Sequence, residues 1–324
     1  MNELCVIILN YRRADLTIEC LRSLADALEG HPRRVAVVVD NGSGDDSADR
    51  LEQAIVENRW DGWARLLRSP VNGGFAAGNN IGFEAEKAEA YLLLNSDARV
   101  KPGAIDGLLR SMRDHPDAGL IGPRLQGPDG RAQVSCFRYR TPVSELLEAA
   151  GTGLLDRWLS RCVVAAGVHD QPVEAQWVSF ACVLIRKAVI ERIGPMDEKY
   201  FMYFEDMDYA RRARRAGWGV LHDPTMSVIH LRGGSSSVKR AFRRRSRVPR
   251  YYYESRSRYF AKYYGGILGI LAANACWYLG RGVALLREIC GAKRVHACAC
   301  ASRDIWTNCL TPLRTPTSPT GGEL

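Results

Sequence analysis

The chain has 324 residues, of which 46% are hydrophobic and 25% are charged, and its formal net charge is +9. This apolar content is enough for a sizeable core and excludes a wholly disordered, collagen-like or coiled-coil chain. The segment from Lys239 to Lys262 holds ten Lys or Arg and one acidic residue, so it alone carries a charge of +9. The remainder of the chain is close to neutral, and the basic character belongs to this one segment.

The N-terminal segment and the cysteines are typical of a cytosolic protein. A secretory signal would need a basic start and an apolar stretch of about 7 to 15 residues, whereas the short run 4–9 passes directly into Asn10-Tyr11-Arg12-Arg13. The ten cysteines are scattered, without the spacing of a disulfide scaffold. We therefore expect a buried first strand and reduced thiols.

The first 122 residues alternate short apolar strands with amphipathic helices, which predicts an α/β fold with a mainly parallel sheet flanked by helices. The predicted strands are 4–9, 34–39, 66–68 and 91–94, and the predicted helices are 16–28, 47–56, 81–88 and 102–114. Residues 72–80, rich in Gly and Asn, are expected to form a loop. Further along, we expect a strand over 177–185, a helix over 205–216 and an extended segment over 220–231.

Polar residues follow the predicted strands at the carboxyl ends, where open parallel sheets bind ligands. They are Asn10, Asp40, the loop 72–80, and Asn95 with Asp97. No G-x-G-x-x-G follows the first strand, which argues against an ordinary dinucleotide-binding dehydrogenase. Asp97 suits Mg²⁺ or Mn²⁺, which take one or two carboxylates plus substrate phosphates. Taken singly, Asp40 could equally be a turn residue, and an acid such as Asp97 is more often a cap.

A second cluster joins aromatic residues to carboxylates, in the run Tyr200-Phe201-Met202-Tyr203-Phe204-Glu205-Asp206-Met207-Asp208-Tyr209. Its ordinary interpretation is that acids favour helix N-termini through the macrodipole. In the functional interpretation the dipole keeps Asp206 ionised beside an aromatic wall, which suits a base that accepts a hydroxyl proton. His230 ends a predicted strand; such a residue is usually structural, but beside a metal-binding Asp it is a candidate ligand.

Four motifs occur in a fixed order along the chain. They are Val37-Val38-Val39-Asp40-Asn41-Gly42-Ser43, Asn72-Gly73-Gly74-Phe75-Ala76-Ala77-Gly78-Asn79-Asn80, Leu92-Leu93-Leu94-Asn95-Ser96-Asp97 and Phe204-Glu205-Asp206-Met207-Asp208. Together they resemble the family 2 glycosyltransferases, and in particular their rhamnosyltransferase-like branch. The resemblance runs from about Leu4 to Tyr264, and the joint match is specific although each motif alone is not.

The resemblance implies a GT-A fold and an inverting sugar transfer from a nucleotide diphosphate donor. On this model Asn10 and Asp40 hold the nucleotide, while Asn79 and Asn95 help to position the donor. The substrate-binding set also includes Tyr11, Asn41, Gly74, Gly78, Trp177 and Asp208. The resemblance further implies that Asp97 and His230 hold a divalent cation, Mg²⁺ or Mn²⁺, and that Asp206 is the general base with Glu205 as its helper.

Two positions depart from the family pattern. Asn95 stands at the first acidic position of the D-x-D-type motif, which leaves fewer charges for a metal. Phe180 stands where the family usually has glycine, and its ring would narrow or reshape the acceptor side. The nature of the acceptor is therefore left open.

The basic segment interleaves arginines with aromatic residues. This composition could bind RNA, but no recognisable nucleic-acid fold is present, so no nucleic-acid partner is expected. An anionic cytoplasmic membrane surface fits better. The apolar run 265–280 is shorter than the about 20 residues of a spanning helix, which favours an interfacial amphipathic helix. A solvated basic helix with a packed apolar cap is the alternative.

The sequence thus predicts a GT-A catalytic domain over 1–235, with a nucleotide-sugar half over 1–122 and an acceptor half over 123–235. A membrane-associating segment follows over 236–290, and a disordered tail over 291–324. The predicted activity is metal-dependent transfer of L-rhamnose from dTDP-rhamnose to a cell-envelope glycan or lipid-linked acceptor, by an enzyme peripheral to the inner face of the membrane. A UDP-hexose-dependent transferase and a non-catalytic nucleotide-sugar-binding protein are the alternatives, and a homo-oligomer is left open.

Overall fold

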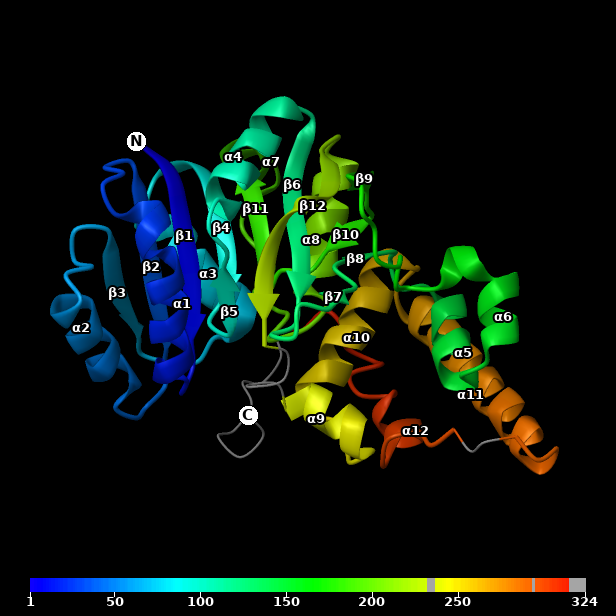
Figure 1. Cartoon of the computed structure of the whole chain (residues 1–324). Helices are drawn as coiled ribbons and strands as arrows, with labels where there is room; N and C mark the ends of the chain where they lie inside the picture. Colours follow the sequence, from blue (N-terminus) through cyan, green and yellow to red (C-terminus); the bar gives the residue numbers. More distant parts are fainter. Residues whose placement is uncertain (232–236, 293–294, 315–324) are drawn as a thin grey trace. The chain divides into compact units, whose positions relative to one another are not determined.

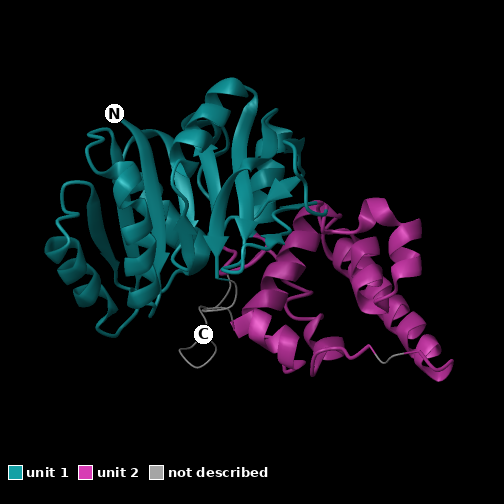
Figure 2. Cartoon of the chain, in the orientation of Figure 1, with its two compact units in different colours: residues 1–137, 167–198, 205–235 teal, residues 138–166, 199–204, 236–324 magenta. Residues whose placement is uncertain are grey.

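The computed structural model describes residues 1–231, 237–292 and 295–314 (Figure 1). The chain divides into two compact units (Figure 2). Unit 1 comprises residues 1–137, 167–198 and 205–235, and unit 2 comprises 138–166, 199–204 and 236–324. Residues 138–166 group with unit 2, although the sequence analysis assigned them to the catalytic domain, because the helix that follows Thr141 packs along a C-terminal helix. The predicted domain boundaries themselves stay predictions.

Unit 1 holds an α/β sheet. Its first half contains β1 (Asn2–Asn10), α1 (Ala14–Leu28), β2 (Arg34–Asn41), α2 (Ser47–Glu57), β3 (Ala64–Ser69), α3 (Gly74–Ala85), β4 (Ala88–Asn95), β5 (Ala98–Val100) and α4 (Ala104–Asp114). Its second half contains β6 (Ala118–Gln126), β7 (Ala132–Gln133), β8 (Cys136–Phe137), β9 (Val173–Glu174), β10 (Trp177–Val178), β11 (Cys182–Arg186), α7 (Lys187–Ile193), α8 (Glu205–Arg215) and β12 (Gly219–His230).

The main sheet has the strand order β3-β2-β1-β4-β11-β6-β12-β5, with β7 on β6 and β9 on β12. The pairs β1/β2, β1/β4, β2/β3 and β6/β12 are parallel, and β11 and β5 run antiparallel to their neighbours. This arrangement confirms the predicted α/β class with a mainly parallel central sheet.

The two faces of β1 carry different helices because successive side chains of a strand point to opposite faces. Leu4, Val6 and Ile8 are fully buried in a core that includes residues of α1, α2 and α4. Ile7 and Leu9 face α3. Burial on both faces explains why the sequence of this strand is a continuous apolar run rather than an alternating one.

The helix α3 replaces the loop predicted over residues 72–80, so that prediction was wrong. Gly78 and Gly82 lie one helical turn apart, and a Cβ at these positions would collide with the side chains of Leu9 and Ile7 respectively. The glycines therefore let the helix approach β1 closely. In the sequence alone, glycines that permit such packing look the same as the glycines of a loop. The strand predicted over 177–185 is likewise divided into β10, which pairs with β8, and β11, which joins the main sheet.

Unit 2 is helical. It contains α5 (Pro142–Ala150), α6 (Gly153–Trp158), the 3-10 helix η1 (Ser160–Cys162), α9 (Ser237–Arg244), α10 (Arg250–Tyr263), α11 (Ile267–Ile289) and α12 (Ala301–Asp304). Thr141 caps α5, since its side chain accepts a hydrogen bond from the backbone N–H of Ser144 at 3.1 Å. Residues 251–261 of α10 are all buried, so this half of the basic segment is internal.

The exposed cations of the basic segment lie on α9, on the turn after it and at the first residue of α10: Lys239, Arg240, Arg243, Arg244, Arg245, Arg247 and Arg250. The helix α11 exposes an apolar side, formed by Ile267, Leu268, Leu271, Tyr278, Leu279, Leu285, Leu286 and Ile289. With 23 residues it is longer than the predicted apolar run, and by length and composition alone it could cross a membrane; 33% of its apolar window is buried. Among the described residues it is the only such helix.

The C-terminal segment differs from the disorder expected over residues 291–324. Residues 295–314 are described and include α12. Asp304 accepts two hydrogen bonds from the guanidinium of Arg247, at 2.7 and 3.1 Å, and the hydroxyl of Tyr278 donates to the backbone carbonyl of Ser302 at 2.7 Å. The residues 315–324 of the predicted tail lie outside the described residues.

Candidate active site

The sheet register aligns the polar residues that follow three parallel strands. Asn10 of β1 lies beside Asp40 of β2, and Leu9 lies beside Asn95 of β4. The carboxyl ends of β1, β2 and β4 thus deliver these side chains to one edge of the sheet, where open α/β sheets bind ligands. The predicted convergence of Asn10, Asp40 and Asn95 is what the structure shows.

A buried hydrogen-bond network fixes Asp40. Its Oδ1 accepts from Asn10 Nδ2 at 2.7 Å and from the Ser43 hydroxyl, and its Oδ2 accepts from the backbone N–H of Ser43 at 3.2 Å. The Thr17 hydroxyl donates to Asn10 Oδ1 at 2.8 Å and so orients the amide. Ser43 and Thr17 were not predicted as site residues; the signal for Ser43 was its place in the Asp40-Asn41-Gly42-Ser43 motif.

Asn41 holds the segment that leads into α3. Its Nδ2 donates to Asn72 Oδ1 at 2.9 Å and to the Gly74 carbonyl at 3.1 Å, while its Oδ1 accepts from the Gly73 N–H at 3.2 Å. Gly74 has φ +86°, a conformation that favours glycine. Asn41 and Gly74 therefore shape the backbone at this edge.

The amide side chains of Asn79 and Asn80 in α3 form hydrogen bonds with backbone groups. Asn79 is 1% exposed and donates to the Phe75 carbonyl at 2.8 Å. Asn80 donates to the Met196 carbonyl at 3.0 Å and accepts from the Met196 N–H at 2.9 Å. Asn80 thus ties α3 to the segment after α7, and Gly78 is explained by close helix packing on Leu9.

Asp97 and His230 meet across the pairing of β5 with β12. Because His230 lies opposite Ala98 in this antiparallel pair, the ring is next to the residue that precedes β5. His230 Nε2 is 3.3 Å from Asp97 Oδ1, and both side chains are buried. The Gln133 amide donates to the His230 carbonyl at 3.0 Å and is a neighbour that the sequence analysis did not identify.

The donor set of this pair fits a divalent cation. A carboxylate and an imidazole suit Mn²⁺, and a carboxylate with phosphate oxygens suits Mg²⁺. Among the described residues, Nδ1 of His230 is buried without a hydrogen-bond partner, an unusual state for a buried ring nitrogen. The same part of the chain holds no group of three or more His, Cys, Asp or Glu side chains placed for a metal, so this pair alone would leave coordination positions for a substrate.

The acidic cluster begins α8, as predicted, with Glu205, Asp206 and Asp208 in the first turn. The residues before it, Tyr203 and Phe204, both have φ +71°, and two consecutive non-glycine residues in the left-handed region store strain next to a candidate site. The Asp206 carboxylate accepts from the backbone N–H of Met207 at 2.7 Å. Asp206 is partly exposed, whereas the other two acids are buried.

The three acids differ in their surroundings. Burial raises the pKa of Glu205 well above its ordinary value, and the carboxylates of Asp206 and Asp208 raise it further. Among the described residues, Glu205 Oε2 is buried without a hydrogen-bond partner. Asp208 accepts from Arg212 Nε at 3.0 Å, and Arg212 also donates to the Ile193 carbonyl at 2.8 Å. Burial and the two neighbouring carboxylates therefore favour the neutral form of Glu205, while Asp208 belongs to an ion pair.

Two predicted substrate-binding residues lie in aromatic contacts. The Trp177 ring stacks on Phe137, with centroids 4.3 Å apart. The guanidinium of Arg12 lies 5.2 Å from the ring centroid of Tyr11. Phe180 is 3% exposed and lies edge-on to Tyr209, with centroids 6.2 Å apart.

Comparison with known proteins assigns the family. The model of the family described as Glycosyl transferase family 2 matches residues 5–194. The chain belongs to this family.

Relatives place the chain near the rhamnosyltransferases within family 2. It is 30% identical over 233 residues to the N-acetylglucosaminyl-diphospho-decaprenol L-rhamnosyltransferase of Mycobacterium tuberculosis, a match that covers 67% of this chain and 72% of that protein. It is 24% identical over 234 residues to the low-salt glycan biosynthesis hexosyltransferase Agl10 of Haloferax volcanii, covering 71% and 67% of the two chains. The predicted family and branch are confirmed, and the protein is a glycosyltransferase.

Solved structures confirm the predicted GT-A fold of this family 2 member. The mannosyltransferase PcManGT of Pyrobaculum calidifontis, in complex with GDP-Man and Mn²⁺, matches with a TM-score of 0.57 at 15% identity, over 90% of this chain and 76% of that chain. GalNAc-T7 with UDP, GalNAc and Mn²⁺ matches with a TM-score of 0.51 at 13% identity, over 73% and 46%. At these identities the likeness concerns the fold.

Proposed function

We propose that this glycosyltransferase transfers L-rhamnose from dTDP-rhamnose, with inversion, to a hydroxyl of a lipid-linked or cell-envelope glycan acceptor. The observation that carries a catalytic rather than a binding role is the buried pair of Asp97 and His230 at the sheet edge, in the same unit as the acidic first turn of α8. The mycobacterial L-rhamnosyltransferase supports the donor sugar and the diphospholipid class of acceptor.

On the donor side, Asn10 and Asp40 bind the nucleotide, and their mutual hydrogen bond preorganises both groups. Asn79 and Asn95 help to position the sugar diphosphate, with Tyr11, Asn41, Gly74, Gly78 and Trp177 completing the substrate-binding set. The backbone fixed by Asn41 allows a close approach to a ligand at this edge.

Asp97 and His230 would hold Mn²⁺ or Mg²⁺. When bound, the cation supplies positive charge that stabilises the departing nucleotide diphosphate. Mn²⁺ accompanies the nucleotide or nucleotide sugar in the two similar solved structures, which supports a divalent cation in this enzyme.

On the acceptor side, Asp206 is the general base. It accepts the proton of the acceptor hydroxyl as the oxygen attacks the anomeric carbon, and the bond from that carbon to the diphosphate breaks. A single displacement of this kind inverts the anomeric centre and needs no second carboxylate as nucleophile. Glu205 is the helper: its raised pKa favours the neutral form, which lessens the negative charge beside the base, while Asp208 is neutralised by Arg212.

A UDP-hexose donor is the alternative within the class, supported by the hexosyltransferase relative of Haloferax volcanii. A non-catalytic nucleotide-sugar-binding protein is the alternative outside it. The test is release of nucleotide diphosphate from a panel of dTDP-, UDP- and GDP-sugars with membrane lipid extract, with and without Mn²⁺ or Mg²⁺. We expect metal-dependent release from dTDP-rhamnose that is lost in Asp97→Ala. Release from a UDP-sugar alone would show that the donor is a UDP-sugar instead of dTDP-rhamnose. Binding without release from any donor would favour the non-catalytic alternative.

We further propose that the enzyme works at the cytoplasmic face of the membrane, as a peripheral protein. The exposed cations of α9 and the exposed apolar side of α11 support this location, because basic and apolar groups together bind anionic bilayers. Replacing Lys239, Arg240, Arg243 and Arg244 with Gln should weaken sedimentation with phosphatidylglycerol vesicles by about 100-fold or more. Unchanged sedimentation would reject the electrostatic part of the proposal.

A further inference from the structure

Unit 2 contains a cavity of about 340 Å³ that is distinct from the sheet edge described above. Its wall is formed by side chains of α5, α9, α10 and α11 and by residues between 295 and 305. Arginines and aromatic rings dominate this wall. A cavity of this size can enclose most of a small ligand.

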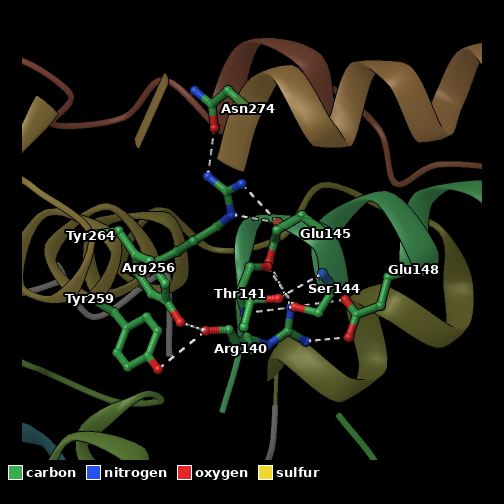
Figure 3. Close-up of polar contacts among 9 residues, drawn as sticks. All are labelled: Arg140, Thr141, Ser144, Glu145, Glu148, Arg256, Tyr259, Tyr264 and Asn274. Carbon is green, nitrogen blue, oxygen red and sulfur yellow. Dashed lines mark hydrogen bonds and ion pairs between the residues drawn. The ribbon is translucent and has the colours of Figure 1, made fainter. Parts of the chain in front are cut away.

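Two arginines of the wall, the buried Arg256 and the partly buried Arg140, are already neutralised (Figure 3). Arg256 is 2% exposed and donates from Nε and Nη2 to Glu145 Oε2, at 2.9 and 2.7 Å. Its Nη1 donates to Asn274 Oδ1 at 2.8 Å. Arg140 donates to Glu145 Oε1 at 2.9 Å and to Glu148 Oε1 at 2.7 Å. Two arginines and two glutamates thus form a closed, satisfied network that supports the wall.

The other two arginines of the wall are Arg245 and Arg281, and neither forms an ion pair with a carboxylate in the described part of the chain. Arg281 Nη1 donates to the Val295 carbonyl at 2.7 Å. Arg245 follows the last turn of α9 with φ +56°, and its carbonyl accepts from the Ala299 N–H at 3.1 Å. Both residues are therefore held against the segment 295–299, with guanidinium donors remaining for another acceptor.

The charge and shape of the wall together restrict the ligand. Four arginines against two glutamates give the lining a net charge of +2, which favours an anionic group such as a diphosphate. Arginine is the side chain best suited to phosphate groups, because its planar donors bind two oxygens at once.

Aromatic rings form the apolar part of the wall. The Tyr252 ring lies edge-on to Phe242, with centroids 5.4 Å apart, and to Tyr253 at 5.5 Å. Trp277 of α11 also lines the cavity. These rings offer apolar surface to a hydrocarbon chain within the same cavity as Arg245 and Arg281.

We propose that this cavity binds an amphiphile in which a diphosphate is joined to an apolar chain, with the diphosphate on Arg245 and Arg281 and the chain along the rings. The proposal rests on the proposed function for the role of the ligand, which would be the lipid-linked acceptor. The chemistry of the ligand follows from the cavity alone. The cavity would then select the acceptor by its diphospholipid part rather than by its sugar.

Calorimetric titration of the full-length Asp206→Asn variant with farnesyl diphosphate tests the proposal without turnover. We expect saturable binding that weakens at least about tenfold when Arg245 and Arg281 are both replaced with Gln, the scale of lost charge-assisted hydrogen bonds. The matched control is Arg157→Gln with Arg161→Gln, which removes the same charge from exposed positions of α6 and η1 in the same unit, outside the cavity wall, and should leave the affinity unchanged. Circular dichroism verifies that both double variants fold.

Absence of saturable binding, or equal loss of affinity in both double variants, would overturn the proposal. Farnesol binding as tightly as farnesyl diphosphate would overturn the role of the arginines. Pyrophosphate binding as tightly as farnesyl diphosphate would overturn the amphiphile, because the source of the anion would then be a free diphosphate. A catalytically inactive enzyme that nevertheless binds farnesyl diphosphate through Arg245 and Arg281 would overturn the proposed function and leave this inference standing.

Discussion

The Nε2 atom of His230 lies 3.3 Å from Oδ1 of Asp97, and the two side chains come from strand-flanking positions more than a hundred residues apart in the sequence. The antiparallel pairing of β5 with β12 sets this distance, because it places His230 opposite Ala98. His230 ends β12 and Asp97 lies in the two-residue turn between β4 and β5, so the strand pairing on either side keeps the two candidate ligands in fixed relation.

Replacing His230 with Gln should raise the Mn²⁺ concentration needed for half-maximal transfer by about tenfold or more, since one nitrogen ligand is lost. The measurement is nucleotide diphosphate release over a Mn²⁺ titration. His169, a histidine of the same unit outside the pair, provides the control as His169→Gln. An unchanged Mn²⁺ requirement in His230→Gln would show that the ring is not a ligand.

Replacing Asp206 with Asn should lower kcat by about 10²- to 10⁴-fold, because a general base is lost. Donor affinity should remain, since Asp206 acts on the acceptor. The two effects are separated by single-turnover transfer and by calorimetric titration with the donor. Transfer at the normal rate would reject Asp206 as the base, and a parallel loss of donor binding would indicate a donor-side role instead.

Glu205 makes the stability depend on pH. Burial raises its pKa in the folded protein, so above the ordinary pKa the unfolded chain releases a proton that the folded chain retains. The free energy of unfolding therefore falls as the pH rises from about 4.5 toward the folded-state pKa of Glu205. Glu205→Gln should remove this pH dependence. Urea unfolding of both proteins between pH 5 and 8 should then show that the free energy of unfolding of the variant rises relative to that of the parent as the pH increases. A constant difference across this range would contradict the assignment.

The close approach of α3 to β1 predicts that one added methyl group between them destabilises the fold. A Cβ at Gly82 would lie 2.8 Å from Ile7 Cγ1 and 2.9 Å from Ile7 Cδ1, on a fully buried, β-branched side chain. Gly82→Ala should destabilise the fold by about 1–3 kcal/mol, despite the better helix propensity of alanine. Gly62→Ala is the control, because a Cβ there has no neighbour within 4 Å, and its effect should stay within about 0.5 kcal/mol.

The buried ion pair of unit 2 predicts a loss of stability when one partner is removed. Arg256→Met should cost about 3–5 kcal/mol, since Glu145 would lose its two bonds from Arg256 within the protein interior. Arg33→Met breaks an ion pair in which both side chains, Arg33 and Glu89, are exposed, and should cost no more than about 1 kcal/mol. Urea unfolding measures both, and equal costs would show that burial of the Arg256 pair is unimportant.

The strand ends were the most predictable part of the molecule. Apolar runs that stop at Asn10, Asp40 and Asn95 describe parallel strands buried on both faces, and the register then places the polar residues at one edge. The acidic start of α8 was equally visible, because carboxylates at a helix N-terminus form a local pattern.

Features that depend on tertiary neighbours were not predictable. A glycine such as Gly78 is expected both in a loop and in a helix that packs closely on a strand. The contact with Leu9, which the sequence does not reveal, distinguishes the two. Arg256 reads as a surface cation, yet it is buried by its bonds to Glu145, a residue from a distant segment. Ser43 and Thr17 act through their contacts with Asp40 and Asn10, which no periodicity in the sequence reveals.

Unit 2 is assembled from three separate stretches of the chain, and one of them, residues 199–204, leads directly into the helix that carries Asp206. A chain ended after residue 235 would keep α5 but lose α11, the helix along which it packs. The helical unit therefore cannot be removed or exchanged as a terminal cassette. Substitutions in the C-terminal third that leave unit 2 folded must therefore preserve the packing of α11 on α5, which lies more than a hundred residues upstream.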